Sequence, residues 1–239
     1  MSQADFRLEV LSVAALDTAV WLPEIRAMHI ETIVVGPYEV NCYILSQKDA
    51  AQAVVIDPGA ETDVIVQYLR AERLAPAAYL LTHGHVDHIG GLEQMLAVLP
   101  APVYLHADEK NWAFSKRNSL PPFYFPPSTP PADLHVVADG DEFNLAGIPF
   151  RVIATPGHTV GGVCYYVEQE NALFTGDTLF QGTVGRTDLP GGDGRVLAQS
   201  LKKLAVLPSV TRVYPGHGPE TSIADERRHN VYFRTPAAL

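Results

Sequence analysis

The stretch of sequence with the strongest structural signal is residues 77–88, AAYLLTHGHVDH, in which a short apolar run leads directly into a cluster of histidines. The apolar half has the length of a strand, and no linker separates it from the polar cluster. His83, His85, Asp87 and His88 then place imidazole and carboxylate groups within six residues. Such groups are ligands for zinc, iron and manganese, so the stretch predicts a metal site at the end of a strand.

Three loops further along the chain repeat this arrangement of a strand followed by a histidine or an aspartate. The predicted strands at residues 150–154, 172–175 and 210–214 lead into the loops TPGHT, TGDT and PGHG. Rigid strands hold the loops at their ends in register, and sites in layered α/β proteins are assembled there for that reason. We therefore predict that the ligands of all four loops converge on one metal centre, which gives the set His83, His85, Asp87, His88, His158, Asp177 and His217.

These loops resemble those of a known family. The segments THGHVDH (82–88), GHT (157–159), TGDTLF (175–180) and PGHG (215–218) are similar to motifs of the metallo-β-lactamase superfamily. Within that superfamily they resemble the short, single-domain glyoxalase II-like (hydroxyacylglutathione hydrolase-like) hydrolases. The resemblance extends over about residues 28–230 and implies an α/β fold, namely a four-layer αββα sandwich. It also implies that residues 28–239 form a single catalytic domain.

The resemblance assigns the ligands to two metal positions. It implies that His83, His85 and His158 bind a first metal ion. It implies a second ion on a further group of three residues: Asp87, His88 and His217. The cofactor is then one or two transition-metal ions, with Zn²⁺ as the first expectation and iron or manganese as alternatives.

Three carboxylates receive separate roles. Asp177 is the candidate for a bridge between the two ions, since a carboxylate has two oxygens and an imidazole cannot bridge in this way. Asp57, in the motif Asp57-Pro58-Gly59, matches an early aspartate of the family and would orient ligands by hydrogen bonds. Asp87 would also act in catalysis, by steering the attacking hydroxide or by passing a proton to the leaving group.

The implied reaction is hydrolysis of a thioester such as S-lactoylglutathione by attack of a metal-bound hydroxide. The expected substrate is a small acylated thiol, and Arg186 is the candidate for binding its carboxylate. Larger family members carry a C-terminal helical domain that contributes to the glutathione site, whereas 22 residues follow His217 here. The alternatives are a mononuclear-iron persulfide dioxygenase, or a hydrolase of another ester, lactone or phosphodiester substrate. A β-lactamase is disfavoured because those enzymes lack the aspartate found here as Asp177.

Composition restricts the partners. The formal net charge is −10 with histidines neutral, which argues against nucleic acid, because phosphate binding normally needs a basic surface. Residues 1–27 lack the basic start and the unbroken apolar stretch of a signal peptide, and no stretch is long enough to cross a membrane. We therefore predict a cytoplasmic protein, a monomer or small homo-oligomer, with residues 1–27 as an N-terminal appendage. Cys42 and Cys164 lie in apolar runs and are expected to be buried core residues.

Hydrophobic periodicity gives a coarse map of the elements. Helices are predicted at residues 62–73, capped by Thr62 or Asp63, and at 92–99, 108–114, 195–207, capped by Asp193, and 224–230. Further strands are predicted at 30–35, 41–45, 53–56, 103–105 and 162–167. The proline- and aromatic-rich loop 119–131, SLPPFYFPPSTPP, is predicted to form a wall of the substrate entrance, with a subunit contact as the competing interpretation.

Overall fold

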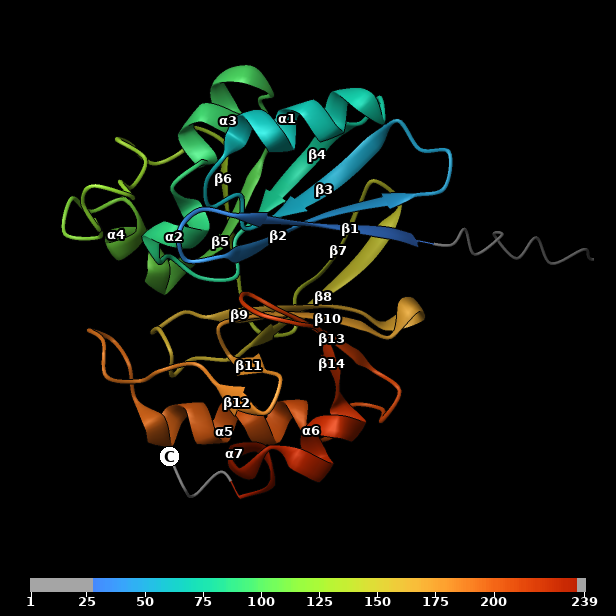
Figure 1. Cartoon of the computed structure of the whole chain (residues 1–239), viewed down its shortest axis with the longest axis vertical. Coiled ribbons are helices and arrows are strands. Elements are labelled where there is room, and N and C mark those ends of the chain that lie inside the picture. The colour runs from blue at the N-terminus through green and yellow to red at the C-terminus, as the bar shows by residue number, and fades with distance from the viewer. Residues whose placement is uncertain (1–27, 236–239) are drawn as a thin grey trace, which may run out of the picture.

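The computed structural model describes residues 28–235, so the predicted appendage, residues 1–27, lies outside the described residues. Within the described range, two six-stranded sheets stack face to face, and a two-stranded sheet lies beside the second of them (Figure 1). Helices cover the outer face of each large sheet. No helix among these residues is both long and apolar enough to cross a lipid bilayer.

The first large sheet is built from the N-terminal half of the described chain. Its strands lie in sequence order: β1 (Met28–Val35), β2 (Val40–Gln47), β3 (Gln52–Ile56), β4 (Ala75–Leu80), β5 (Val103–His106) and β6 (Leu134–Val137). Strands β1 to β3 are antiparallel, and β3 to β6 are parallel. Parallel neighbours require crossover connections, which the helices between them supply.

The second large sheet is built from the C-terminal half. In spatial order its strands are β14 (Thr221–Ser222), β13 (Arg212–Pro215), β10 (Ala172–Gly176), β9 (Val163–Val167), β8 (Ile148–Ala154) and β7 (Glu142–Leu145). Strands β10 and β13 are parallel, and the other neighbours are antiparallel. The small sheet pairs β11 (Leu179–Phe180) with β12 (Thr183–Val184).

The helices fall into an upper and a lower set in Figure 1. Beside the first sheet lie α1 (Thr62–Ala71), α2 (Val86–Ile89), α3 (Leu92–Val98), the 3₁₀ turn η1 (Ala107–Glu109) and α4 (Lys110–Ala113). Beside the second sheet lie the 3₁₀ turn η2 (Glu168–Glu170), α5 (Gly194–Leu204), α6 (Ile223–His229) and α7 (Val231–Arg234).

Three separate apolar cores define the layers. One lies between α1, α3 and the first sheet, one between the two sheets, and one between the second sheet and α5 to α7. Strand β2 shows how the sequence builds them, because its side chains alternate: Cys42 and Ile44 join the outer core, while Tyr43 and Leu45 join the central one. Four layers separated by three cores form an αββα sandwich, which confirms the predicted fold class.

The structure differs from the sequence-based map mainly at the edges. Strands β6 and β7 were not predicted, because each has only four residues and lies at the end of its sheet. Helix α5 begins as expected, with the Asp193 side chain accepting hydrogen bonds from the N–H groups of Arg195 and Val196, but it ends at Leu204. Helix α1 is preceded by Glu61, which makes no side-chain cap and instead accepts a hydrogen bond from Gly36 N at 3.0 Å.

Candidate metal centre

The two large sheets are joined by backbone hydrogen bonds at the edge where the predicted ligand loops lie. Val163 N at the start of β9 donates to Thr82 O just after β4, and Asn41 N in β2 donates to Gly216 O just after β13, each at 2.8 Å. The loops that follow β4, β8, β10 and β13 therefore meet at one edge of the sandwich. All seven predicted ligands lie in these loops or in α2, which begins directly after the first of them.

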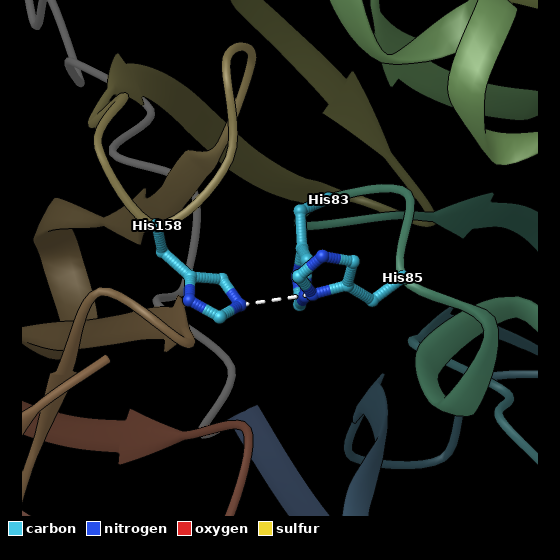
Figure 2. Close-up of side chains that lie close together, drawn as sticks. All are labelled: His83, His85 and His158. Atoms are coloured by element: carbon cyan, nitrogen blue, oxygen red, sulfur yellow. Dashed lines mark hydrogen bonds between the residues drawn. The ribbon is translucent and has the colours of Figure 1, made fainter. Parts of the chain in front are cut away.

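Three imidazoles form one cluster, called here the three-histidine group: His83, His85 and His158. Their possible ligand atoms lie within 4.8 Å of one another, so the group can hold a metal ion. Figure 2 shows His158 reaching from one side toward His83 and His85 on the other, with His158 Nε2 at 3.0 Å from His85 Nδ1. The first two histidines come from the first half of the molecule and the third from the second half.

A carboxylate and two imidazoles form the adjacent cluster, called here the mixed group: Asp87, His88 and His217. Its possible ligand atoms also lie within 4.8 Å of one another. His88 Nε2 is 3.3 Å from His217 Nε2, which in turn is 3.5 Å from Asp87 Oδ2. The side chain of His88 is fully buried, whereas that of His217 is 26% exposed and opens this group toward solvent.

Asp177 lies between the two groups and contacts both. Its Oδ2 is 3.5 Å from His158 Nε2 and 3.6 Å from His217 Nε2, and its Oδ1 is 3.3 Å from His88 Nε2. The Oδ1 atom is buried and has no hydrogen-bond partner among the described residues. A carboxylate in this position can face two cations at once.

Asp57 contacts His88 of the mixed group directly and His83 of the three-histidine group through Thr82. Its Oδ2 lies 2.9 Å from His88 Nδ1 and accepts a hydrogen bond from Thr82 Oγ1 at 2.6 Å, while its Oδ1 accepts from Thr82 N at 2.8 Å. Because the Thr82 hydroxyl donates to Asp57, it accepts from Nδ1 of His83, 3.1 Å away. Asp57, His83 and His88 also lie close enough to form a third possible metal group, but the Asp57 oxygens are already engaged in these contacts.

The hydrogen bonds fix which imidazole nitrogens are free. Nδ1 of His88 donates to the Asp57 carboxylate, and those of His158 and His217 donate to backbone carbonyl oxygens, at 2.7–2.9 Å. In the neutral form of each ring, Nε2 therefore carries the lone pair, and the Nε2 atoms face the centre of the site. Nε2 of His83 is likewise buried and without a hydrogen-bond partner in the described part of the chain. Lone pairs that face one another repel unless a cation or a proton lies between them, so the donor set fits a metal ion.

The electrostatics of the two groups differ. Burial and the neighbouring His88 hold the pKa of His83 well below its usual value, and burial and His158 lower the pKa of His85 to about 4. In the mixed group burial opposes charge on His88, but Asp177 and Asp87 raise its pKa well above the usual value. Near pH 7 His83 and His85 are thus neutral, whereas the mixed group attracts positive charge.

The two carboxylates in and beside the mixed group, Asp87 and Asp177, have lowered pKa values. Burial alone would raise the pKa of Asp177, but the His88 imidazole holds it well below the usual value. For Asp87 the same two effects compete, and His88 and a hydrogen bond with His217 lower its pKa. Both aspartates are therefore ionised and need a compensating positive charge.

The comparisons with known proteins agree with this geometry. A family model described as the metallo-beta-lactamase superfamily matches residues 35–217, which include all seven predicted ligands. The chain belongs to the metallo-β-lactamase superfamily.

Relatives of this superfamily member include named hydrolases. It is 41% identical to the probable metallo-hydrolase YqgX of Bacillus subtilis, over 83% of this chain and 94% of YqgX. It is 32% identical to hydroxyacylglutathione hydrolase GloC of Haemophilus influenzae, over 87% of this chain and 99% of GloC. The protein is thus a metallo-hydrolase whose histidine and aspartate groups can bind a metal ion.

Two solved structures match this superfamily member along nearly their whole length. The crystal structure of the B3 metallo-beta-lactamase BLEG-1 has a TM-score of 0.81 and 37% identity, covering 86% of this chain and 99% of that one. The crystal structure of TTHA1623 in a di-iron-bound form has a TM-score of 0.74 and 36% identity, covering 84% of this chain and 99% of that one.

A cavity of about 730 Å³ opens onto the metal centre of this superfamily member. Its floor includes five of the seven predicted ligands: His85, Asp87, His158, Asp177 and His217. Its walls are largely apolar and come from both halves of the molecule, with Trp112 and Leu120 on one side and Phe180, Val184 and Leu189 on the other. The cavity can therefore hold a small organic substrate directly above the ligand atoms.

Two arginines line this cavity and differ in their partners. Arg186, predicted to bind substrate, forms a two-point ion pair with Asp188, with Nε–Oδ1 at 2.7 Å and Nη2–Oδ2 at 2.8 Å. Arg117 has no carboxylate within ion-pair distance among residues 28–235. Sequence reasoning did not single out Arg117, because an arginine in a loop resembles any other solvated charge.

The proline-rich loop contributes less to the cavity than its composition suggested. Its first residues, Ser119 and Leu120, line the wall, but its aromatic residues do not. Tyr124 is buried and its hydroxyl accepts a hydrogen bond from Tyr38 N at 3.1 Å, whereas Phe123 and Phe125 are 61% and 58% exposed. Only the start of the loop is therefore an entrance wall.

Sequence reasoning missed groups that hold the ligands through the backbone. The carbonyl oxygen of Tyr38 accepts from His217 Nδ1 at 2.8 Å, and a backbone carbonyl carries no residue-type signal. The buried Glu109 and Asn118 bind the backbone of the loop that carries His83 and His85; Glu109 lies in a predicted helical segment and Asn118 just after it, and neither residue type stood out there. His106 and His135 lie outside both groups.

Proposed function

We propose that this protein hydrolyses thioesters of small thiols, with S-lactoylglutathione as the model substrate. The observation that carries the proposal is the placement of Asp177 between two ligand groups on the floor of a cavity of about 730 Å³. The similarity to GloC, named a hydroxyacylglutathione hydrolase and covered over 99% of its length, supports the substrate class.

In this proposal the three-histidine group and the mixed group would each hold one cation, and Asp177, which contacts both groups, would serve as a ligand shared between them. Zn²⁺ is the first expectation, and iron is the main alternative because TTHA1623, 36% identical, binds two irons in its crystal structure. When bound, such cations lower the pKa of a coordinated water and polarise a carbonyl oxygen. Asp57 serves both groups by fixing His88 directly and His83 through Thr82.

The reaction adds water to the thioester carbonyl, breaks the carbon–sulfur bond and yields an acid and a thiol. One proton of the water must reach the sulfur of the leaving thiolate. We assign this transfer to Asp87, which lines the cavity, lies 3.5 Å from His217 and has a lowered pKa that keeps it ionised and able to accept a proton. The apolar cavity walls exclude water from the rest of the substrate.

Two arginine side chains at the rim of the cavity, Arg117 and Arg186, suit a substrate that carries a carboxylate. We assign carboxylate binding to Arg186, whose side chain must first leave or share its ion pair with Asp188. That pair is exposed, so a substrate carboxylate can compete with it at little cost. Arg117, without such a partner among the described residues, is a second candidate on the opposite wall.

The test combines metal analysis with three activity assays on the same purified protein, reconstituted in turn with Zn²⁺, Fe²⁺ or Mn²⁺. We expect two metal ions per chain and release of glutathione from S-lactoylglutathione. A β-lactam serves as the second substrate, because BLEG-1 is named a metallo-beta-lactamase and is 37% identical. The third assay follows oxygen consumption with glutathione persulfide. Activity on the lactam or the persulfide without thioester hydrolysis would overturn the proposal.

A further inference from the structure

Glu109 is a fully buried acidic residue outside both ligand groups. It ends η1, and its two carboxyl oxygens accept hydrogen bonds from two different loops: Oε2 from Gly84 N at 2.9 Å and Oε1 from Gly161 N at 2.6 Å. No lysine, arginine or histidine forms an ion pair with it among residues 28–235. A buried carboxyl group without a cation is costly, so this arrangement calls for a reason beyond packing.

The two loops that Glu109 joins carry all members of the three-histidine group. Gly84 lies between His83 and His85, after the last strand residue of β4 in the first half of the molecule. Gly161 lies three residues after His158, between β8 and β9 in the second half. One side chain thus spans from the loop of two ligands to the loop of the third.

The backbone is shaped to admit this side chain. A Cβ atom on Gly84 would lie 2.7 Å from Glu109 Oε2, and one on Gly161 would lie 2.6 Å from His106 Nδ1 and 3.1 Å from Glu109 Cγ. Any larger residue at either position would push Glu109 away from the N–H group it binds. Both contacts therefore depend on glycine at the position of close approach.

The neighbouring contacts differ from those of Glu109, because none is made by a side chain that binds both ligand loops. Asn118 accepts from Val86 N at 3.1 Å and donates to Gly84 O at 2.7 Å, so it shapes the His83–His85 loop alone. The backbone bond from Val163 N to Thr82 O joins the two sheets, but it lies beyond Gly161 along the chain. Glu109 is the side chain in the described part of the chain that binds both ligand loops.

We propose that Glu109 is a positioning residue that sets the spacing between the His83–His85 loop and the His158 loop, and so tunes metal affinity at the three-histidine group. It contacts no residue of the mixed group, and its effect is therefore selective. The proposal rests on the proposed metal binding, and the experiment below separates failure of the one from failure of the other.

The test compares Glu109→Gln with Glu226→Gln. Glutamine keeps the shape of the side chain but replaces one acceptor oxygen with a donor, so one backbone N–H loses its partner. Glu226 is the matched control: it is 1% exposed and accepts hydrogen bonds from Gly182 N, Thr221 and Asn230, away from the ligands. The second test variant, Glu109→Asp, keeps the charge but is too short to reach both loops.

Each group is measured separately, in chains that also carry His217→Ala or His85→Ala. Zn²⁺ affinity is obtained by competition with a chromophoric chelator, the visible spectrum of the Co²⁺-loaded protein reports ligand geometry, and thermal unfolding reports stability. In the His217→Ala chain we expect both Glu109 variants to weaken Zn²⁺ binding roughly 10–100-fold and to alter the Co²⁺ spectrum. In the His85→Ala chain we expect no change. Glu226→Gln should lower the unfolding temperature without changing either affinity.

The outcomes separate the two claims. If the unmodified chain takes up no Zn²⁺, Fe²⁺ or Mn²⁺, the proposed function fails. If it takes up metal but Glu109→Gln leaves affinity and spectrum unchanged, the inference alone fails. It also fails if the Glu109 variants and Glu226→Gln weaken both groups in proportion to their loss of stability, since Glu109 is then a structural residue like its control.

Discussion

The three-histidine group and the mixed group share Asp177 as a neighbour, but they differ in the charge and the pKa values of the side chains that could hold a cation. The first is made of three imidazoles, and burial favours the neutral form of His83 and His85, with the pKa of His85 lowered to about 4. The second contains a carboxylate, and its imidazoles have raised pKa values because Asp87 and Asp177 lie close to them. Its His217 is also partly open to solvent.

This difference predicts a division of labour between the groups. A ligand that is already neutral binds a metal without first losing a proton, whereas a protonated imidazole must be deprotonated. The three-histidine group should therefore be the tighter and less pH-sensitive position, and the mixed group the one that exchanges protons and metal. Four sets of experiments follow in order of decreasing expected effect; the first three test that division, and the last tests the cavity rim.

Replacing Asp177, which contacts both groups, should abolish the difference in metal affinity between them. Asp177→Ala removes the carboxylate that contacts both groups, and we expect loss of metal from both and of thioesterase activity. The loss of metal affinity should exceed the roughly 10–100-fold loss that is typical when a residue hydrogen-bonded to a ligand is replaced, because Asp177 faces the ligand atoms directly. Elemental analysis and thiol-release assays measure it. His106→Ala is the control and should leave both nearly intact, so equal losses in the two variants contradict our sorting of residues.

Changing the support beneath the groups should affect them unequally. Asp57→Asn places an N–H group opposite His88 Nδ1, which forces the proton onto Nε2 and removes that lone pair from the mixed group. We expect affinity at the mixed group to fall roughly 10–100-fold. Thr82→Val removes the hydroxyl contacts to His83 and to Asp57 Oδ2 but leaves the bond between Asp57 and His88, so we expect a smaller loss, mainly at the three-histidine group. Chelator competition distinguishes the two patterns, and a reversed pattern is incompatible with the hydrogen bonds described.

Acidification should empty one group before the other. The raised pKa values of His88 and His217 mean that protons bind there below those values, so metal affinity falls as pH falls through them. His85, with a pKa of about 4, stays neutral over the same range. As the pH falls, the ion at the mixed group should therefore be lost before the ion at the three-histidine group, so metal content should pass from two ions to one. Calorimetry should also show proton release when the second ion binds; loss of both ions together argues against unequal groups.

The rim arginines should give the smallest effects, because their side chains belong to neither ligand group; Arg186 contacts His158 only through its backbone carbonyl oxygen, which an alanine retains. We expect Arg186→Ala to raise KM for S-lactoylglutathione roughly two- to fivefold with little change in kcat, as for an exposed charge pair. Arg117→Ala should likewise raise KM if both arginines bind the substrate. Metal content should not change in either variant. A fall in kcat with unchanged KM places these residues outside substrate binding.

The ligand loops were predictable from the sequence because their signal is local. Four short apolar runs that each end in a loop with histidine or aspartate mark strand ends, and the structure places those loops at one edge of the sandwich. The four layers followed from the family resemblance, since strand patterns alone do not state how sheets stack. Confirmation by three separate cores came only with the structure.

What remained hidden depends on contacts between segments far apart in sequence. Glu109 binds Gly84 and Gly161, which are 25 and 52 residues away, and nothing in its own neighbourhood distinguishes it from a surface glutamate. The short strand β6 escaped notice because half of a four-residue edge strand faces solvent. In the loop 119–131, composition revealed the aromatic residues but not that Tyr124 faces inward while its neighbours face out.

Both ligand groups lie where the two large sheets meet, and this position determines when a cation can bind during synthesis of the chain. The ribosome releases His83, His85, Asp87 and His88 early, but His158, Asp177 and His217 emerge from the second half of the chain. Neither group is complete until those later residues have folded onto the first sheet. A cation could therefore bind either group only once both halves have folded, and a free cation concentration of 100 times its Kd would then stabilise the folded state by about 2.7 kcal/mol.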